Sequence, residues 1–83
     1  QQLLDLAYNT VRKRVADALY LLNKKYADEE YIPASRTDLA SIVGTATESV
    51  IRNLSEFKES KIIEVKGNKI KILNEEKLAA IKY

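Results

Sequence analysis

The first third of the chain carries apolar residues at the three- and four-residue steps of an amphipathic helix. The pattern begins near Asn9 and Thr10, which look like a helix start, and runs to about Tyr26. Its apolar members are Val11, Val15, Ala18, Leu19, Leu22 and Tyr26. Residues 1–8 are short and apolar-rich, and two interpretations stay open for them: the end of a longer helix from an upstream domain, or a frayed terminus.

Two shorter helices are predicted over residues 36–43 and 46–60, separated by a tight turn at Gly44. Glycine suits the left-handed backbone that ends a helix, because it has no Cβ to clash. Ser35 and Asp38 have the spacing of a capping box at the first of these helices, and Thr45 and Glu48 repeat it at the second. Two capped helices joined by a glycine-containing turn are typical of a helix-turn-helix.

Each of these two helices has a predicted inner face. The first directs three apolar residues inward, Leu39, Ile42 and Val43. The second has an apolar stripe at i, i+4 and i+7, formed by Val50, Leu54 and Phe57. Its opposite side carries two hydroxyls, one carboxylate, one guanidinium and one aliphatic group: Thr47, Glu48, Ile51, Arg52 and Ser55.

Alternating apolar and polar residues after position 61 predict a β-hairpin. Residues 62–66 and 69–73 form its strands, and Gly67-Asn68 forms a two-residue turn of the kind that needs positive φ. Lys61 stands where glycine would be the least strained residue, so a strained exit from the preceding helix is expected.

Two short segments complete the pattern. Residues 31–33 read as an extended piece that could be an edge strand but not a central one, because Pro33 has no N–H to donate. Asn74 begins a last helix that docks through Leu78 and Ile81. The element order predicts a mainly α fold with a small β-hairpin, a winged helix-turn-helix: a three-helix core, a β wing and a short C-terminal helix.

Composition narrows the possible functions. The 83 residues suffice for one domain. The sequence has no cysteine and no histidine, which removes the commonest metal ligands and general base, so neither a metal site nor an enzyme is expected. No apolar run approaches the ~20 residues of a membrane span. The chain starts without methionine, and we expect it to be a fragment of something longer or a processed form.

The charge pattern and the outward helix face leave alternatives open. The net charge is only +2, but basic residues gather at positions 12–14 and at Lys66, Lys69 and Lys71. The hairpin lysines either keep a sheet edge from aggregating or form a basic wing on a phosphate backbone. Glu48 and Arg52 are either an i, i+4 surface ion pair or readers of base edges, since Glu accepts from cytosine and Arg donates twice to guanine.

Residues 35–52, SRTDLASIVGTATESVIR, resemble the C-terminal DNA-binding domain of the Crp/Fnr family of bacterial transcription regulators. The family pattern is T/S-R-x-x-L/I-A-x-x-V-G, followed after a few residues by E-T/S-V/I-x-R. The positions that match in register are Leu39-Ala40, Val43-Gly44, Glu48-Ser49-Val50 and Arg52. The similarity extends from about Thr10 to Leu73.

The resemblance implies roles for individual residues. Base reading is expected of Thr47, Glu48, Ile51, Arg52 and Ser55. Phosphate contacts are implied for Arg36, Thr37, Ser49, Lys66 and Gly67, which match phosphate-holding positions of the family. Phosphate contacts are also expected of Arg12, Thr45 and Lys69. Thr47 stands where arginine occurs in the family, so a different half-site is expected. Ile51 replaces a usually small residue and places an apolar contact in the groove.

The resemblance also implies parts outside this chain. Residues 1–9 would be the hinge at the end of a dimerisation helix, and residues 10–83 the DNA-binding domain. No cofactor is expected in this chain; an effector, with a cyclic nucleotide as one candidate, would bind a missing N-terminal β-roll. The implied partners are double-stranded DNA with a palindromic site, a second copy of the chain held through the missing region, and RNA polymerase, all in the bacterial cytoplasm. A winged-helix module for protein–protein contact is the alternative, and Ile51 is the residue that favours it.

Overall fold

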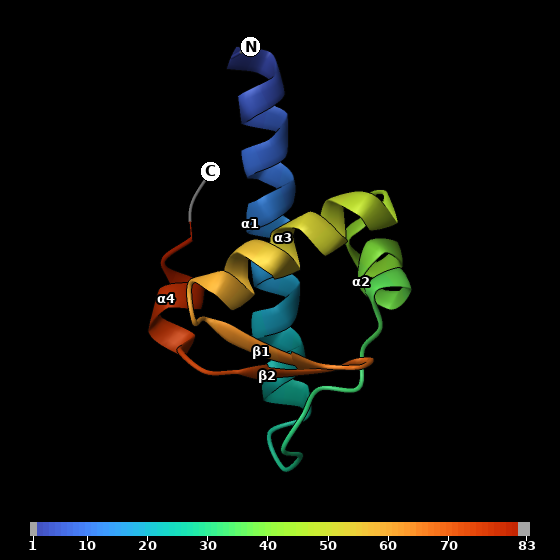
Figure 1. Ribbon diagram of the computed structural model, residues 1–83, viewed down its shortest axis with the longest axis vertical. Coiled ribbons are helices and arrows are strands. Elements are labelled where there is room, and N and C mark those ends of the chain that lie inside the picture. The colour runs from blue at the N-terminus through green and yellow to red at the C-terminus, as the bar shows by residue number, and fades with distance from the viewer. Residues whose placement is uncertain (1, 82–83) are drawn as a thin grey trace.

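The computed structural model describes residues 2–81, and within them it contains four helices and one two-stranded sheet. In chain order the elements are α1 (Gln2–Lys25), α2 (Arg36–Val43), α3 (Thr47–Glu59), β1 (Ile63–Lys66), β2 (Lys69–Ile72) and α4 (Glu75–Ala79). Figure 1 shows α3 crossing α1, with α2 and α4 at opposite ends of α3 and the hairpin beneath it. The predicted fold class is confirmed.

Helix α1 is longer than the sequence pattern indicated. It begins at Gln2, so the predicted start at Asn9 and Thr10 is wrong. Residues 2–9 contain neither glycine nor proline, so nothing in them interrupts the helical hydrogen bonds. Its 24 residues make a rod roughly 36 Å long, and its N-terminal end projects beyond the other elements (Figure 1). The role of residues 1–9 as a hinge stays a prediction, and residue 1 lies outside the described part.

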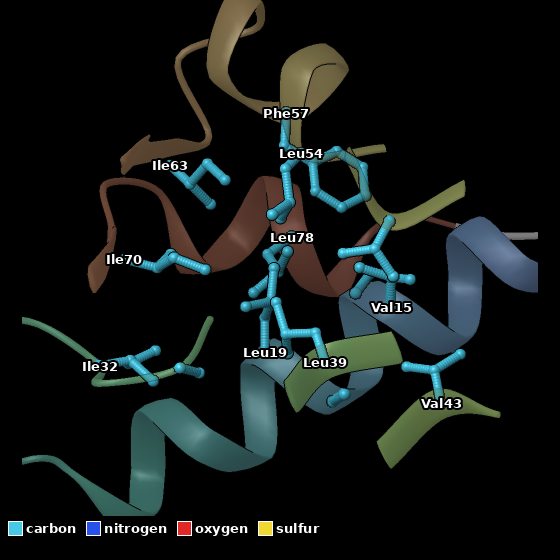
Figure 2. Packing of buried hydrophobic residues seen from close by; sticks show 14 of the residues in the cluster. Val15, Leu19, Ile32, Leu39, Val43, Leu54, Phe57, Ile63, Ile70 and Leu78 are labelled. Atoms are coloured by element: carbon cyan, nitrogen blue, oxygen red, sulfur yellow. The ribbon is translucent and has the colours of Figure 1, made fainter. Parts of the chain in front are cut away.

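One hydrophobic core joins all the elements. Figure 2 shows side chains from the helices and both strands meeting in one interior. The largest fully buried apolar side chains are Phe57, Leu19, Leu39, Ile63, Ile70, Leu78, Val15 and Val50. The prediction that Ile42 points inward is wrong, because its side chain is 59% exposed. Helix α2 buries a narrow stripe of Leu39, Ala40 and Val43, and Ile42 falls to one side of that stripe.

Backbone geometry fixes the turn between α2 and α3. Gly44 has φ 80°, and the N–H groups of Gly44 and Thr45 both donate to the carbonyl of Ala40, at 2.8 and 3.0 Å. The capping box of Ser35 and Asp38 is confirmed, with both reciprocal hydrogen bonds present.

The second predicted capping box, Thr45 with Glu48, is wrong. Helix α3 starts one residue later than expected, so its N-cap is Ala46, which has no side-chain oxygen to accept a hydrogen bond. Thr45 therefore lies one position before the cap. Glu48 still lies in the first turn, where a carboxylate interacts favourably with the helix dipole.

The exit from α3 carries the strain expected at Lys61. This residue has φ 63°, and it is the one non-glycine residue with positive φ in the described part of the chain. The N–H of Ile62 donates to the carbonyl of Phe57 at 2.9 Å, and the N–H of Lys61 donates to that of Lys58 at 3.1 Å. This pair of bonds is a Schellman motif, which glycine usually completes.

Replacing Lys61 with glycine should stabilise the domain. The left-handed conformation costs an L-residue on the order of 1 kcal/mol or more, and glycine removes that cost. We expect Lys61→Gly to raise the free energy of unfolding by about 1 kcal/mol, or Tm by roughly 4–8 °C, in urea and thermal unfolding. Lys61→Ala removes the same charge but keeps the Cβ, so it should show no such gain. If the two variants were equally stable, the expected backbone strain at Lys61 would be contradicted.

The hairpin forms in the predicted register. Lys66 pairs with Lys69 across the two-residue turn Gly67-Asn68, and Ile63 pairs with Ile72. Gly67 has φ 61°, whereas Asn68 is not among the positive-φ residues, which is typical of a type II′ turn. The expected edge strand is confirmed as a single bridge in which Ile32 and Ile70 exchange hydrogen bonds of 2.6 and 2.9 Å.

The last helix also follows the prediction. The side chain of Asn74 caps α4 by accepting from the N–H of Lys77 at 3.0 Å. Leu78 and Ile81 are buried in the core. Helix α4 packs against α1, whereas α2 packs against α3 and α1.

Candidate nucleic-acid interface

The outward face of α3 is open to solvent along its length. Glu48, Ile51, Arg52 and Ser55 are exposed, and Thr47 is half-buried. The opposite stripe is fully buried in the core, as predicted. The amphipathic pattern of α3 therefore brings the five expected base-reading residues onto the solvent side of a single helix.

A shallow hollow runs along the turn between α2 and α3. Its lining is rich in hydroxyl groups and comprises Thr37, Ala40, Ser41, Gly44, Thr45, Ala46, Thr47 and Glu48. Hydroxyls and backbone N–H groups are common donors to phosphate oxygens. Two of the expected phosphate contacts, Thr37 and Thr45, thus lie together here, while a third, Ser49, is half-buried one turn further along α3.

An arginine from α1 holds this turn in place. Arg14 Nη2 donates a hydrogen bond to the carbonyl oxygen of Val43, in the last turn of α2. That carbonyl has no partner within its own helix, and a cation at a helix C-terminus also suits the helix dipole. The sequence places Arg14 in a basic cluster, but it does not reveal this bond, because the two residues are 29 positions apart.

The lysines of the wing differ in their exposure and in their ion pairing. Lys71 lies 3.8 Å from the carboxylate of Glu30, so part of its charge is already balanced. Lys66 and Lys69 are exposed and directly opposite each other at the base of the turn. Like charges in direct cross-strand register repel each other, and an anion bound near the wing tip would offset that repulsion.

Tyr31 contacts three side chains of the wing. The Tyr31 hydroxyl donates to Glu64 Oε2 at 2.6 Å, and Lys66 and Lys71 each lie 5.9 Å from the centre of its ring. The hydrogen bond to the Glu64 carboxylate raises the pKa of Tyr31 above its usual value, with further contributions from burial and from the charges of Glu64 and Glu30. The hydroxyl therefore stays a donor throughout the neutral pH range.

Arg12 is the one expected phosphate contact that α1 supplies. It lies on α1, is half-buried, and its Nε is covered without a hydrogen-bond partner in the described part of the chain.

On α3, the Asn53 side chain is fully buried, and its amide has no described partner either. Burial, followed by repulsion from Glu59, raises the pKa of Glu56. Ionised Glu56 thus opposes folding at neutral pH, and this cost disappears as the pH falls through its pKa.

Among the side chains that the structure describes, those of residues 10–81, there is no group of three or more histidine, cysteine, aspartate or glutamate residues placed to hold a metal ion. None of the described helices has the length and hydropathy to cross a membrane.

Comparison with known proteins gives a consistent family. The Crp-like helix-turn-helix domain matches residues 13–81. The fumarate and nitrate reduction regulatory protein of Vibrio cholerae is 30% identical over 84 residues, covering 94% of this chain. The probable transcriptional regulator flp of Lacticaseibacillus casei is 40% identical over 60 residues, covering 69% of this chain.

A solved structure agrees with these sequence matches. FixK2 from Bradyrhizobium japonicum superposes with a TM-score of 0.78 at 25% identity, over 88% of this chain and 38% of its own. The chain spans 34% of the Vibrio relative and 27% of the Lacticaseibacillus relative. The chain thus belongs to the Crp-like helix-turn-helix family, and it is a DNA-binding domain of the transcription-regulator class.

Proposed function

We propose that α3 enters the major groove of DNA and reads base edges with its N-terminal half. The observation that carries this proposal is the solvent-facing row on α3, in which Glu48 and Arg52 lie one turn apart. Glutamate accepts from cytosine N4, and arginine donates two hydrogen bonds to guanine O6 and N7. Ile51, 43% exposed, supplies an apolar surface suited to a thymine methyl group.

In this proposal, the wing and the start of α2 bind the phosphates that flank the bases read by α3. Lys66, Gly67 and Lys69 form the wing tip, and Arg36 and Thr37 begin α2. Such contacts position the domain on the duplex without specifying sequence. The cross-strand pair of Lys66 and Lys69 supports the proposal, because a phosphate there relieves their repulsion.

In the full-length protein we expect a homodimer. Two copies then read half-sites about one helical turn, ~34 Å, apart on a palindromic site. An effector bound outside this chain would change the spacing of the two copies by favouring one of two arrangements. RNA polymerase as a partner, the bacterial cytoplasm as the location and the absence of catalysis belong to the same proposal, supported by the regulatory names of the relatives.

A salt titration with mixed-sequence DNA tests DNA binding against the protein–protein alternative. Four of the proposed phosphate contacts are cationic: Arg12, Arg36, Lys66 and Lys69. If all four neutralise phosphates, a log–log plot of the association constant against salt should have a slope of roughly −3 to −4. Fluorescence anisotropy of a labelled duplex, at salt concentrations between roughly 50 and 300 mM, measures this slope. A flat plot would contradict the proposed function and favour a protein-binding module.

A further inference from the structure

A second hollow lies between α3, the wing and the start of α2. Its lining comprises Arg36, Ile51, Leu54, Ser55, Lys58 and Val65. These residues come from three elements: α2, α3 and β1. Figure 1 shows the same arrangement at the level of the backbone, with the hairpin running beneath α3 toward the start of α2.

The polar groups of this hollow suit an anion. Two of its lining residues, Arg36 and Lys58, are cations, Ser55 is a hydroxyl donor, and no carboxylate is among the described residues that line it. The hollow along the α2–α3 turn, by contrast, includes Glu48. No ion pair with Arg36 or Lys58 occurs in the part of the chain that the structure describes, so no described carboxylate balances either charge at close range.

The position of Lys58 along α3 separates it from the base-reading residues. Ile51, Ser55 and Lys58 follow one another at i, i+4 and i+7 on the outward side of the helix. Lys58 is ten residues beyond Glu48, or roughly 15 Å along the helix axis. The major groove is only about 12 Å wide. If α3 enters the groove with its N-terminal half, as proposed, and Glu48 lies over the bases, Lys58 in the last turn of the helix lies at the level of the sugar–phosphate backbone.

We infer that Arg36, Lys58 and Ser55 form a binding site for one backbone phosphate of the DNA strand that passes between α3 and the wing. This inference rests on the proposed function. It adds Lys58 as a positioning residue, and it moves Ser55 from base reading to phosphate binding. The two cations approach the phosphate from α2 and α3, and the Ser55 hydroxyl donates from between them.

Single-position methylphosphonate substitution of the duplex tests the site, because it removes one phosphate charge at a time. With the unaltered chain, affinity should fall roughly three- to tenfold at each contacted phosphate. At one position this fall should vanish both in Lys58→Ala and in Arg36→Ala, because each variant has already lost a partner of that phosphate. Lys58→Ala should also weaken binding to preferred and mixed sequences alike and reduce the salt slope by about one.

Lys77→Ala is the matched control. It removes one exposed lysine from α4, which carries none of the proposed DNA contacts, so it should leave affinity and salt slope unchanged. Ser55→Ala should weaken binding without altering sequence preference. Thermal unfolding of each variant shows whether a loss reflects the site or the fold.

The outcomes separate the inference from the proposed function. If the unaltered chain shows neither a steep salt slope nor a sequence preference, the proposed function fails and the phosphate site with it. If both are present but Lys58→Ala behaves like Lys77→Ala, the inference alone fails. It is also overturned if Lys58→Ala and Arg36→Ala cancel the effect of two different phosphates, or if Ser55→Ala changes the preferred base.

Discussion

Replacing Arg52 with alanine should remove the domain's preference at one base pair. Arg52 is the arginine of α3, and its guanidinium, on the outward face, can donate two hydrogen bonds to guanine. We expect the variant to lose about 1–3 kcal/mol on its preferred site, which is roughly 5- to 150-fold in affinity. Selection from a randomised duplex pool, followed by anisotropy at fixed salt, measures both the preference and the affinity.

Lys69→Ala provides the comparison for Arg52→Ala. Lys69 is exposed at the wing tip and has the same charge, so both variants lose one positive charge. Lys69→Ala should weaken all sequences alike, whereas Arg52→Ala should in addition flatten the selected motif at one position. An unchanged motif in Arg52→Ala would show that α3 does not read sequence through this residue.

Replacing Phe57 with alanine should have the largest effect on stability. The ring is 2% exposed and lies in the interior where α3 packs on the other elements (Figure 2). Phe→Ala changes in cores cost about 3–5 kcal/mol. A domain of this size has a total stability of roughly 4–12 kcal/mol, so the variant should be partly unfolded near room temperature or have a sharply reduced denaturation midpoint.

Leu73→Ala tests whether this cost comes from burial. Leu73 is 49% exposed, and its N–H bond to the carbonyl of Ile62 is a backbone contact that alanine keeps. The change should cost less than about 1 kcal/mol. Urea unfolding followed by circular dichroism compares the two variants. If Phe57→Ala lowered the free energy of unfolding by less than about 1 kcal/mol, as a surface substitution does, the central place of this ring in the core would be contradicted.

The sequence predicts those features that depend on near neighbours. The turn at Gly44, the capping box at Ser35 and the strained exit at Lys61 each follow from a few adjacent residues and are confirmed. The errors have local causes as well. The N-cap of α3 lies one residue later than predicted, at Ala46. Ile42 lies beside the buried stripe of α2, in which Ala40 takes the place that the prediction gave to Ile42.

The sequence does not predict contacts between distant segments. The bond from Arg14 to Val43 joins α1 to α2 across 29 positions, and the bond from Tyr31 to Glu64 spans 33. Both depend on how the helices and the hairpin pack, which periodicity alone leaves undetermined. The hollow that contains Lys58 follows from the same packing, since its lining comes from three separate elements. The base-reading and phosphate roles themselves stay predictions that the variants above address.

The unbroken length of α1 has a mechanical consequence. Because α1 contacts α2, α3, α4 and β2, we expect a tilt of α1 to be transmitted to each of these elements. A tilt of about 10° about one end of such a rod moves the other end by roughly 6 Å. Successive base pairs are stacked about 3.4 Å apart. A small angular change at the N-terminal end of α1 would thus displace the other end of the helix by nearly two steps of the double helix.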